Sequence, residues 1–183
     1  FSALYRIEAG AWFDQLLPWL QAVLHKDVNG AIPGREGAEI AWDAQAFLEM
    51  AAMKGIDVAP STHDFKKYFD AFDHDFTYEM IIHVGMPPRL AKLTLQLYKK
   101  RNRVVKKGKA HSDSFSTHNG VGQGDILSLI PAMVLASWQF KMMDVGYPNV
   151  EKGAYFDDRN FRGNLDQFIK LDADLHAFDK AAG

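Results

Sequence analysis

The sequence predicts an α+β fold that is mainly helical and contains a few short strands. Apolar side chains recur at helical spacing in several stretches, of which residues 40–52 form the clearest example. Glycine- and proline-rich stretches separate these segments, and an acidic pair stands between two short candidate strands near residue 157. The 183 residues suit one domain or one large piece of a bigger one, since a domain typically has roughly 100–200 residues.

The first half is predicted to be helical with one loop. Residues 2–25 carry a helical apolar pattern that Gly10 and Pro18 interrupt, which predicts two helical pieces. Residues 28–37 hold three glycines and a proline and predict a loop. The helix over 40–52 should end at Gly55, and residues 56–58 are a possible strand. We expect a further helix to begin at the two prolines at 87 and 88, with a buried stripe formed by Leu90, Leu93, Leu97 and Tyr98.

The second half begins with a strongly basic stretch. Seven of the eleven residues over 99–109 are Lys or Arg, and Gly108 supplies a turn, which predicts an exposed hairpin. A helix is expected over 127–138. Strands at 150–156 and 159–161 should flank a two-residue tip, Asp157-Asp158, before an amphipathic helix over 165–178.

Composition excludes several classes of protein. The formal net charge of −2 argues against a globally basic nucleic-acid wrapper, although not against a local basic patch. With no cysteine, disulfides, thiolate zinc sites and cysteine nucleophiles are excluded. The most apolar stretch, 126–138, is shorter than the roughly 18 residues of a membrane span. No signal peptide is recognisable, so we expect an intracellular protein, nuclear or cytoplasmic, and we interpret the chain as a fragment of a longer polypeptide.

Acidic residues in two places could form a metal site. Asp64 follows a possible strand, and Asp157 and Asp158 lie at a possible hairpin bend. If the strands are neighbours, three carboxylates converge, and such a cluster needs a cation such as magnesium to offset its repulsion. Two such ions are the known arrangement for phosphoryl transfer. Taken alone, an Asp pair at a hairpin tip is more often only a turn.

A glycine-rich loop precedes a helix in residues 119–128, Asn-Gly-Val-Gly-Gln-Gly-Asp-Ile-Leu-Ser. Such a loop allows close approach of backbone to a ligand, and helix N-termini favour phosphate. Glycine-rich loops before helices are common, so this loop indicates a function only through its order and spacing relative to the two acidic segments.

Three segments in this order resemble the palm motifs of reverse transcriptases of the non-LTR retrotransposon and group II intron type. Asp64-Phe-Lys-Lys-Tyr-Phe-Asp-Ala-Phe-Asp-His74 resembles the first motif, Gly120-Val-Gly-Gln-Gly-Asp-Ile-Leu-Ser128 the second, and Tyr155-Phe-Asp-Asp158 the third. Leu4-Tyr5-Arg6, Pro33-Gly34-Arg35 and Gly85-Met-Pro-Pro88 resemble segments that surround these motifs in the family. The resemblance covers nearly the whole chain.

The resemblance implies a right-hand polymerase: a palm, with a small antiparallel sheet packed on helices, and part of the fingers. It places partial fingers at 1–55 and the palm at 56–183, with a basic hairpin at 99–115 and no thumb. Asp64, Asp157 and Asp158 would bind two Mg²⁺ or Mn²⁺ ions together with the backbone carbonyl of Phe65. The implied activity is RNA-templated DNA synthesis, with an RNA template, a DNA primer and deoxynucleoside triphosphates as partners, and further domains of one polyprotein are possible.

Nucleotide and nucleic-acid contacts are also implied. Phe69 would lie under the incoming sugar and exclude a 2′-hydroxyl, and Gln123 would lie beside the nucleotide, with Gly122 and Gly124 giving it room. Phosphate contacts would come from the basic hairpin and the fingers loop, through Arg35, Arg101, Arg103, Lys106, Lys107 and Lys109. A solvated charged surface explains the hairpin equally well. We expect the four tryptophans, at 12, 19, 42 and 138, to belong to the core, and His63, His74 and His118 to be structural.

Several residues depart from the family pattern. Ile126 and Leu129 stand where proline is common, and Phe156 is bulkier than usual and should crowd the primer-grip side of the hairpin. These departures leave open an alternative, a catalytically degenerate domain that serves as an RNA-binding or scaffold module. Without a thumb, we expect the isolated fragment to bind template and primer weakly and to show little or no processive synthesis.

Overall fold

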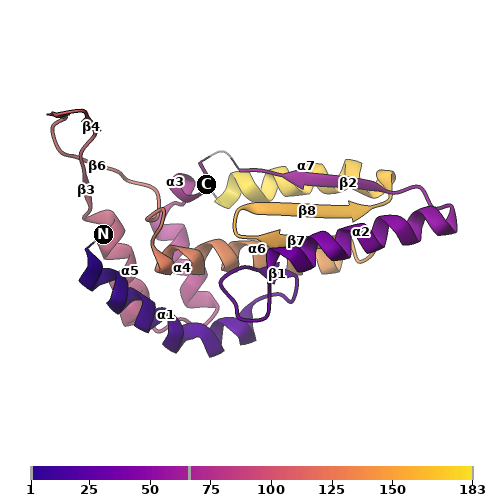
Figure 1. The fold of residues 1–183 in the computed structure, drawn as a ribbon, viewed down its shortest axis with the longest axis horizontal. Coiled ribbons are helices and arrows are strands. Elements are labelled where there is room, and N and C mark those ends of the chain that lie inside the picture. The colour runs from indigo at the N-terminus through magenta and orange to yellow at the C-terminus, as the bar shows by residue number, and fades with distance from the viewer. Residues whose placement is uncertain (1, 66, 183) are drawn as a thin grey trace.

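The computed structural model describes residues 2–65 and 67–182, so Phe1, Gly183 and Lys66 of the predicted first motif lie outside the described part. The molecule is elongated, with a sheet and its covering helices at one end and a group of helices with a thin projecting arm at the other (Figure 1). Helices and a small, mostly antiparallel sheet together form the α+β fold that the sequence predicts.

Helix α1 (Ala3–Val23) is continuous, so the predicted division into two pieces is wrong. Ser2 caps its start by accepting a hydrogen bond from the N–H of Tyr5 at 3.2 Å. Pro18 removes one helical N–H, but it is exposed, and water can reach the carbonyl that loses its partner. The buried side chains that attach α1 to the core recur at helical spacing: Ala9, Phe13, Leu16 and Leu20.

Helix α2 (Gly37–Lys54) ends at Gly55, as predicted. Gly55 adopts a φ of +64°, which glycine tolerates, and donates its N–H to the carbonyls of Ala51 and Ala52. Only Ile40 and Ala51 are buried, so the buried face is narrower than the apolar pattern implies. Trp42 is 74% exposed, and its assignment to the core is wrong.

A four-stranded sheet has the order β1 (Val28–Asn29), β7 (Glu151–Tyr155), β8 (Asp158–Gly163) and β2 (Ala59–His63). β1 runs parallel to β7, and the other pairs are antiparallel. The strand expected at 56–58 begins at Ala59 instead. The hairpin tip is Phe156-Asp157 rather than Asp157-Asp158, because Asp158 pairs with Tyr155 and opens β8.

Helices cover both faces of this sheet. Arg162 of β8 donates to the backbone carbonyl of Ile40 in α2 at 3.3 Å. Arg159, three residues earlier and on the opposite face, donates to Gln139 of α6 (Leu129–Gly146) and lies 3.4 Å from Asp179 of α7 (Leu165–Ala182). The two arginines therefore mark the α2 side and the α6–α7 side of the sheet.

Helix α6 is the central helix of the core and follows the short 3₁₀ turn η1 (Ile126–Ser128). Most of its residues are buried on all sides, from Ile130 to Met143. The span Ile126–Gly146 is by length and composition apolar enough to cross a membrane, which the expectation from 126–138 alone missed. Because 72% of that window is buried inside the fold, we interpret it as a core helix.

The other half of the molecule contains α1 together with α3 (Tyr68–Ala71), α4 (His74–His83) and α5 (Pro88–Lys99) (Figure 1). Asp73 caps α4 by accepting hydrogen bonds from two backbone N–H groups of its first turn. α5 begins at the second of two prolines, as predicted. Its buried stripe is Ala91, Thr94, Leu95 and Tyr98, whereas Leu93 and Leu97 are 41% and 37% exposed, so the predicted stripe is partly wrong.

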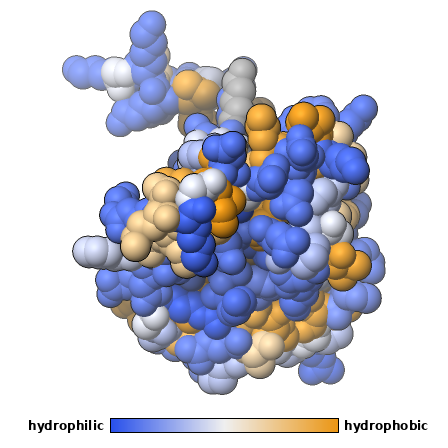
Figure 2. Space-filling view, turned by 90° about the vertical axis from the view of Figure 1, so that its right-hand side faces the viewer, coloured by the Kyte–Doolittle hydropathy of each residue, from blue (hydrophilic) through white to orange (hydrophobic). Residues whose placement is uncertain are grey.

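The basic stretch forms a two-part arm. β3 (Asn102–Arg103) pairs with β6 (Phe115–Ser116) at its base, and β4 (Lys106–Lys107) pairs with β5 (Ala110–His111) near its tip. Gly108, at φ +64°, makes the turn between β4 and β5. The arm stands clear of the body in Figure 1 and is the mainly hydrophilic projection at the upper left of Figure 2.

Candidate active site

The acidic residues singled out in the sequence lie at one end of the sheet. His63, the last residue of β2, pairs with Arg159, so Asp64 follows one step beyond, where the same register leads to Asp158. Asp157 lies in the tip directly before Asp158. Asp64 and Asp158 are exposed, and Asp157 is half-buried. The strand pairing therefore brings carboxylates from two distant parts of the sequence to the same sheet end.

The donor chemistry at this end suits a hard divalent cation. Magnesium prefers carboxylate oxygens and is typically held by one or two of them, together with substrate phosphates and water. Within the described residues, no group of three or more His, Cys, Asp or Glu side chains is arranged to hold a metal ion. The described residues therefore form no ready-made cage of three carboxylates, and a metal ion at this end of the sheet stays a prediction.

The glycine loop is attached to the first motif by backbone hydrogen bonds. The N–H of Val121 donates to the carbonyl of Phe69, and the N–H of Gly120 donates to the carbonyl of Phe72, both at 2.8 Å. Gly120 has a φ of +95°, and a Cβ there would lie 3.1 Å from the Cα of Asp70. Only glycine fits this approach, so its role is close packing against the first motif.

His74 makes a third link between the two motifs. Its imidazole is 2% exposed, and its Nε2 lies 2.8 Å from the carbonyl oxygen of Gly120. A carbonyl only accepts, so Nε2 carries the proton and donates. The sequence predicted a structural role for His74 but named no partner, and the structure identifies the carbonyl of Gly120 as that partner.

Gln123 stands at the apex of a tight turn. The N–H of Asp125 donates to the carbonyl of Gly122 at 2.9 Å, and Gly124 has the positive φ, +79°, that the third position of a type II turn requires. Gly122 is buried, whereas Gln123 is exposed. The turn therefore presents the Gln123 side chain at the surface beside the segment that carries Phe69.

Aromatic rings fill the space behind the first motif. Phe69 is half-buried, and its ring meets that of Tyr68 edge-on, with the centroids 5.6 Å apart. Phe65 is also half-buried and lies under the guanidinium of Arg159, 4.3 Å from ring centroid to Cζ. These contacts fix the segment that follows Asp64 against the core.

Arg159 is the buried centre of a network that the sequence analysis missed. Its side chain is fully buried, donates to Gln139 and to the hydroxyl of Tyr68, and forms an ion pair with Asp179. Burial raises the pKa of Asp179 and of Tyr68, and the charge of Arg159 opposes both shifts. Because side chains alternate along a strand, the apolar Phe161, two residues after Arg159, would have indicated that Arg159 points inward as well.

The tip of the β7–β8 hairpin packs on the loop after β1. Phe156 has a φ of +56°, and its ring lies so close to Gly30 that a Cβ there would be 2.9 Å away. Tyr155 approaches Gly37 similarly, at 3.2 Å from a Cβ position. The absence of a side chain at Gly30 in the loop, and at Gly37 where α2 begins, thus makes room for the rings of Phe156 and Tyr155.

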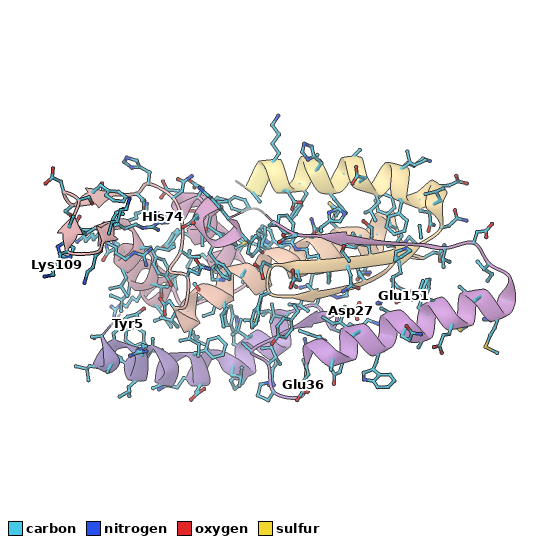
Figure 3. All side chains as sticks on the ribbon, turned by 45° about the horizontal axis from the view of Figure 1, so that its top comes forward. Tyr5, Asp27, Glu36, His74, Lys109 and Glu151 are labelled. Atoms are coloured by element: carbon cyan, nitrogen blue, oxygen red, sulfur yellow. The ribbon has the colours of Figure 1, made fainter. Side chains whose placement is uncertain are left out.

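The predicted phosphate-binding residues differ in their surroundings. Lys106, Lys107 and Lys109 are exposed, and Lys109 lies at the outer end of the arm (Figure 3). Arg103 pairs with Asp70 at 3.4 Å, and the guanidinium of Arg101 lies 5.9 Å from the Tyr98 ring centroid. These contacts anchor the base of the arm beside the first motif and leave its lysines at the surface.

The side chain of Arg35 stabilises the loop that contains it. One of its nitrogens lies within 3.2 Å of both the His25 and Val28 carbonyls and donates to them. Its contact with a template phosphate stays a prediction.

Comparisons with known proteins show structural likeness and no sequence family. No family model matches the chain, and no curated protein matches it in sequence. Among solved structures it is similar to telomerase of Candida tropicalis without its C-terminal domain, with a TM-score of 0.64, 18% identity, and 91% of this chain and 36% of that one covered. It is also similar to Candida albicans telomerase in complex with the TWJ fragment of telomeric RNA, with a TM-score of 0.60, 11% identity, and 95% and 31% covered.

The chain has a reverse-transcriptase-like fold. Telomerases are relatives of reverse transcriptases, and the likeness fits the palm and part of the fingers that the resemblance predicts. At these identities the likeness concerns the fold alone, and the chain spans about a third of the telomerase chains that it matches. It does not distinguish a retrotransposon or intron type.

Proposed function

We propose that this chain is the fingers–palm part of an RNA-directed DNA polymerase of the non-LTR retrotransposon or group II intron type. The observation that carries the proposal is that the first motif lies next to both of the others. The strand directly before it, β2, pairs with β8, which begins at Asp158 of the third motif, and the carbonyl of Phe69 accepts a hydrogen bond from Val121 of the glycine loop. Three motifs from distant parts of the sequence thereby share one end of the sheet.

In this proposal Asp64, Asp157, Asp158 and the backbone carbonyl of Phe65 hold two Mg²⁺ or Mn²⁺ ions. When bound, such ions neutralise the charge of the nucleoside triphosphate during nucleotidyl transfer. Asp64 and Asp158 are exposed, so ions that arrive with the substrate could reach both carboxylates.

The nucleotide would lie between Phe69 and Gln123. Phe69 offers a bulky ring that would exclude a 2′-hydroxyl, and the turn formed by Gly122 and Gly124 presents the Gln123 amide. Phe69→Ala should therefore admit ribonucleotides, measured as the ratio of kcat/KM for a deoxynucleotide and the matching ribonucleotide. Unchanged discrimination would remove the assignment and leave an RNA polymerase of the same fold as a competing interpretation.

Nucleic acid would contact the arm. Two of the telomerase structures contain the TWJ fragment of telomeric RNA, and we extend an RNA partner to this chain by analogy of fold. Exposed lysines at 106, 107 and 109, with the arginines at 101 and 103 beneath them, suit phosphate contacts that do not depend on sequence. The RNA template and DNA primer are the proposed occupants.

The decisive experiment is primer extension by the full-length protein on an RNA template with a DNA primer, deoxynucleotides and Mg²⁺. Asp64→Asn and Asp157→Asn should each lower extension by orders of magnitude and leave the unfolding midpoint nearly unchanged, since both residues lie away from the buried core. Asp172→Asn, an exposed carboxylate of α7, is the matched control and should behave like the unmodified protein. Wild-type extension by Asp64→Asn would contradict the proposal.

A further inference from the structure

A buried carboxylate stands directly behind the turn that carries Gln123. Asp125 is 4% exposed, and its N–H closes the turn onto Gly122. Its Oδ1 accepts from the N–H of Leu127 at 3.3 Å, which caps η1. The turn and the start of the core helix therefore share one residue.

Two tyrosines from distant segments converge on this carboxylate. The hydroxyl of Tyr98 in α5 donates to Oδ2 of Asp125 at 2.6 Å, and that of Tyr5 in α1 donates to the same oxygen at 2.8 Å. Figure 3 shows Tyr5 at the N-terminal end of α1. Burial and the adjacent carboxylate raise the pKa of both phenols above the ordinary range, so both keep their protons and remain donors. Asp125 is thus tied to α1, α5 and η1 at once, and η1 leads directly into α6.

These bonds form a clamp, by which we mean Asp125 with Tyr5 and Tyr98. Hydrogen bonds to an ionised acceptor are short and strong, and a buried carboxylate that loses a donor is left partly unsatisfied. Only Gly124 separates the clamp from Gln123, and a Cβ at Gly124 would meet nothing within 4 Å. The first motif holds the loop on its N-terminal side, through the bonds to Gly120 and Val121, and the clamp holds it on the C-terminal side, directly after Gly124.

Gln123 itself has no competing attachment. In the part of the chain that the structure describes, its side chain forms no hydrogen bond, and the residue is exposed. A side chain that must meet a ligand with a defined orientation then relies on its backbone, which supporting interactions hold.

We propose that Asp125, held by Tyr5 and Tyr98, is the positioning residue that orients Gln123 at the nucleotide site, an inference that rests on the proposed function. The clamp does not touch the nucleotide. It fixes the turn so that the Gln123 amide is presented in one place. A device of this kind acts on nucleotide affinity more than on the chemical step.

The test combines local order with kinetics in the full-length protein. Tyr98→Phe and Tyr5→Phe keep the rings and remove one hydroxyl each. Tyr147→Phe is the matched control, because the Tyr147 hydroxyl donates to Asp174 at 2.6 Å and this bond lies away from the site. Amide hydrogen exchange in peptides over 119–128 should rise about tenfold in Tyr98→Phe, as expected for one lost bond to a charged group. It should be unchanged in the control.

Primer extension should show the same pattern. In Tyr98→Phe the KM for deoxynucleotide should rise about tenfold with kcat changed less than about threefold, since positioning is lost and chemistry is kept. Asp125→Asn retains an acceptor and a helix cap, so it should be milder in both measurements than Asp125→Ala.

The outcomes separate the two proposals. Exchange that stays at the wild-type rate, or that rises evenly through α1, α5 and α6, would overturn the clamp as a positioning device. A looser turn with unchanged KM would overturn its link to the nucleotide. If the unmodified protein extends no primer, the proposed function fails, and exchange over 119–128 still supports or overturns the positioning of the turn.

Discussion

Replacing Gly120 by alanine probes the contact between the glycine loop and the first motif. Gly120 has a φ of +95°, and a new Cβ would lie 3.1 Å from the Cα and 3.2 Å from the carbonyl oxygen of Asp70. A left-handed conformation costs a non-glycine residue about 1–2 kcal/mol. Overlap with backbone that cannot rotate away adds about 1–2 kcal/mol. We expect Gly120→Ala to lower the free energy of unfolding by about 2–4 kcal/mol, measured by urea denaturation.

Two other glycines separate the two contributions. Gly124 also has a positive φ, +79°, but a Cβ there would meet no atom within 4 Å, so Gly124→Ala should cost only the conformational part, about 1–2 kcal/mol. Gly10 lies inside α1 with open space around it, and Gly10→Ala should stabilise the protein by about 0.5–1 kcal/mol. If Gly120→Ala costs no more than Gly124→Ala, the tight approach to Asp70 is wrong.

Arg159→Met should lower the free energy of unfolding by about 3–5 kcal/mol, because the fully buried cation is lost and the half-buried carboxylate of Asp179 is left without its partner. Adding Asp179→Leu should recover most of the loss in urea denaturation, and a double variant as unstable as the single one would contradict the ion-pair argument. Burial raises the pKa of Asp144, but hydrogen bonds from Lys152 and His25 outweigh it and lower that pKa below 3.8. The unfolded state then binds more protons, so stability falls as the pH drops from about 4 through the lowered pKa, and Asp144→Asn should flatten this decline in acid titration. Alanine at 106, 107 and 109 should reduce the slope of log affinity for RNA against log salt by roughly 0.7 to 0.9 per lost phosphate contact, whereas alanine at lysines 54, 170 and 180 should leave it unchanged.

Local signals in the sequence predicted elements where the chemistry is local. A helix stop at Gly55, a helix start at Pro88 and a turn at Gly108 each follow from the backbone preferences of one residue. Where the outcome depends on distant neighbours, the same reasoning failed. The helix α1 tolerates Pro18 because the position is exposed, so water can reach the carbonyl that loses its hydrogen bond. Trp42 lies at the surface because α2 buries only a narrow strip of residues.

The site shows the same division between local and distant effects. Motif order in the sequence placed Asp64, Asp157 and Asp158 together, and the register of β2 with β8 accounts for their common sheet end. No spacing in the sequence relates Tyr5 to Asp125, because their link depends on how α1 packs against the loop before η1. Such a long-range contact leaves no local signal, so motif order predicts the candidate site residues and not the residues packed behind them.

The placement of the carboxylates argues for function on energetic grounds. The register directs Asp64 towards Asp158, and like charges that face each other on neighbouring strands are destabilising. Two nearby arginines have acceptors: Arg159 donates to Asp179, Gln139 and the Tyr68 hydroxyl, and Arg103 donates to Asp70. Among the described residues, no hydrogen bond or salt bridge is found for Asp64, Asp157 or Asp158. In the proposed function, a bound cation would offset the repulsion between these carboxylates.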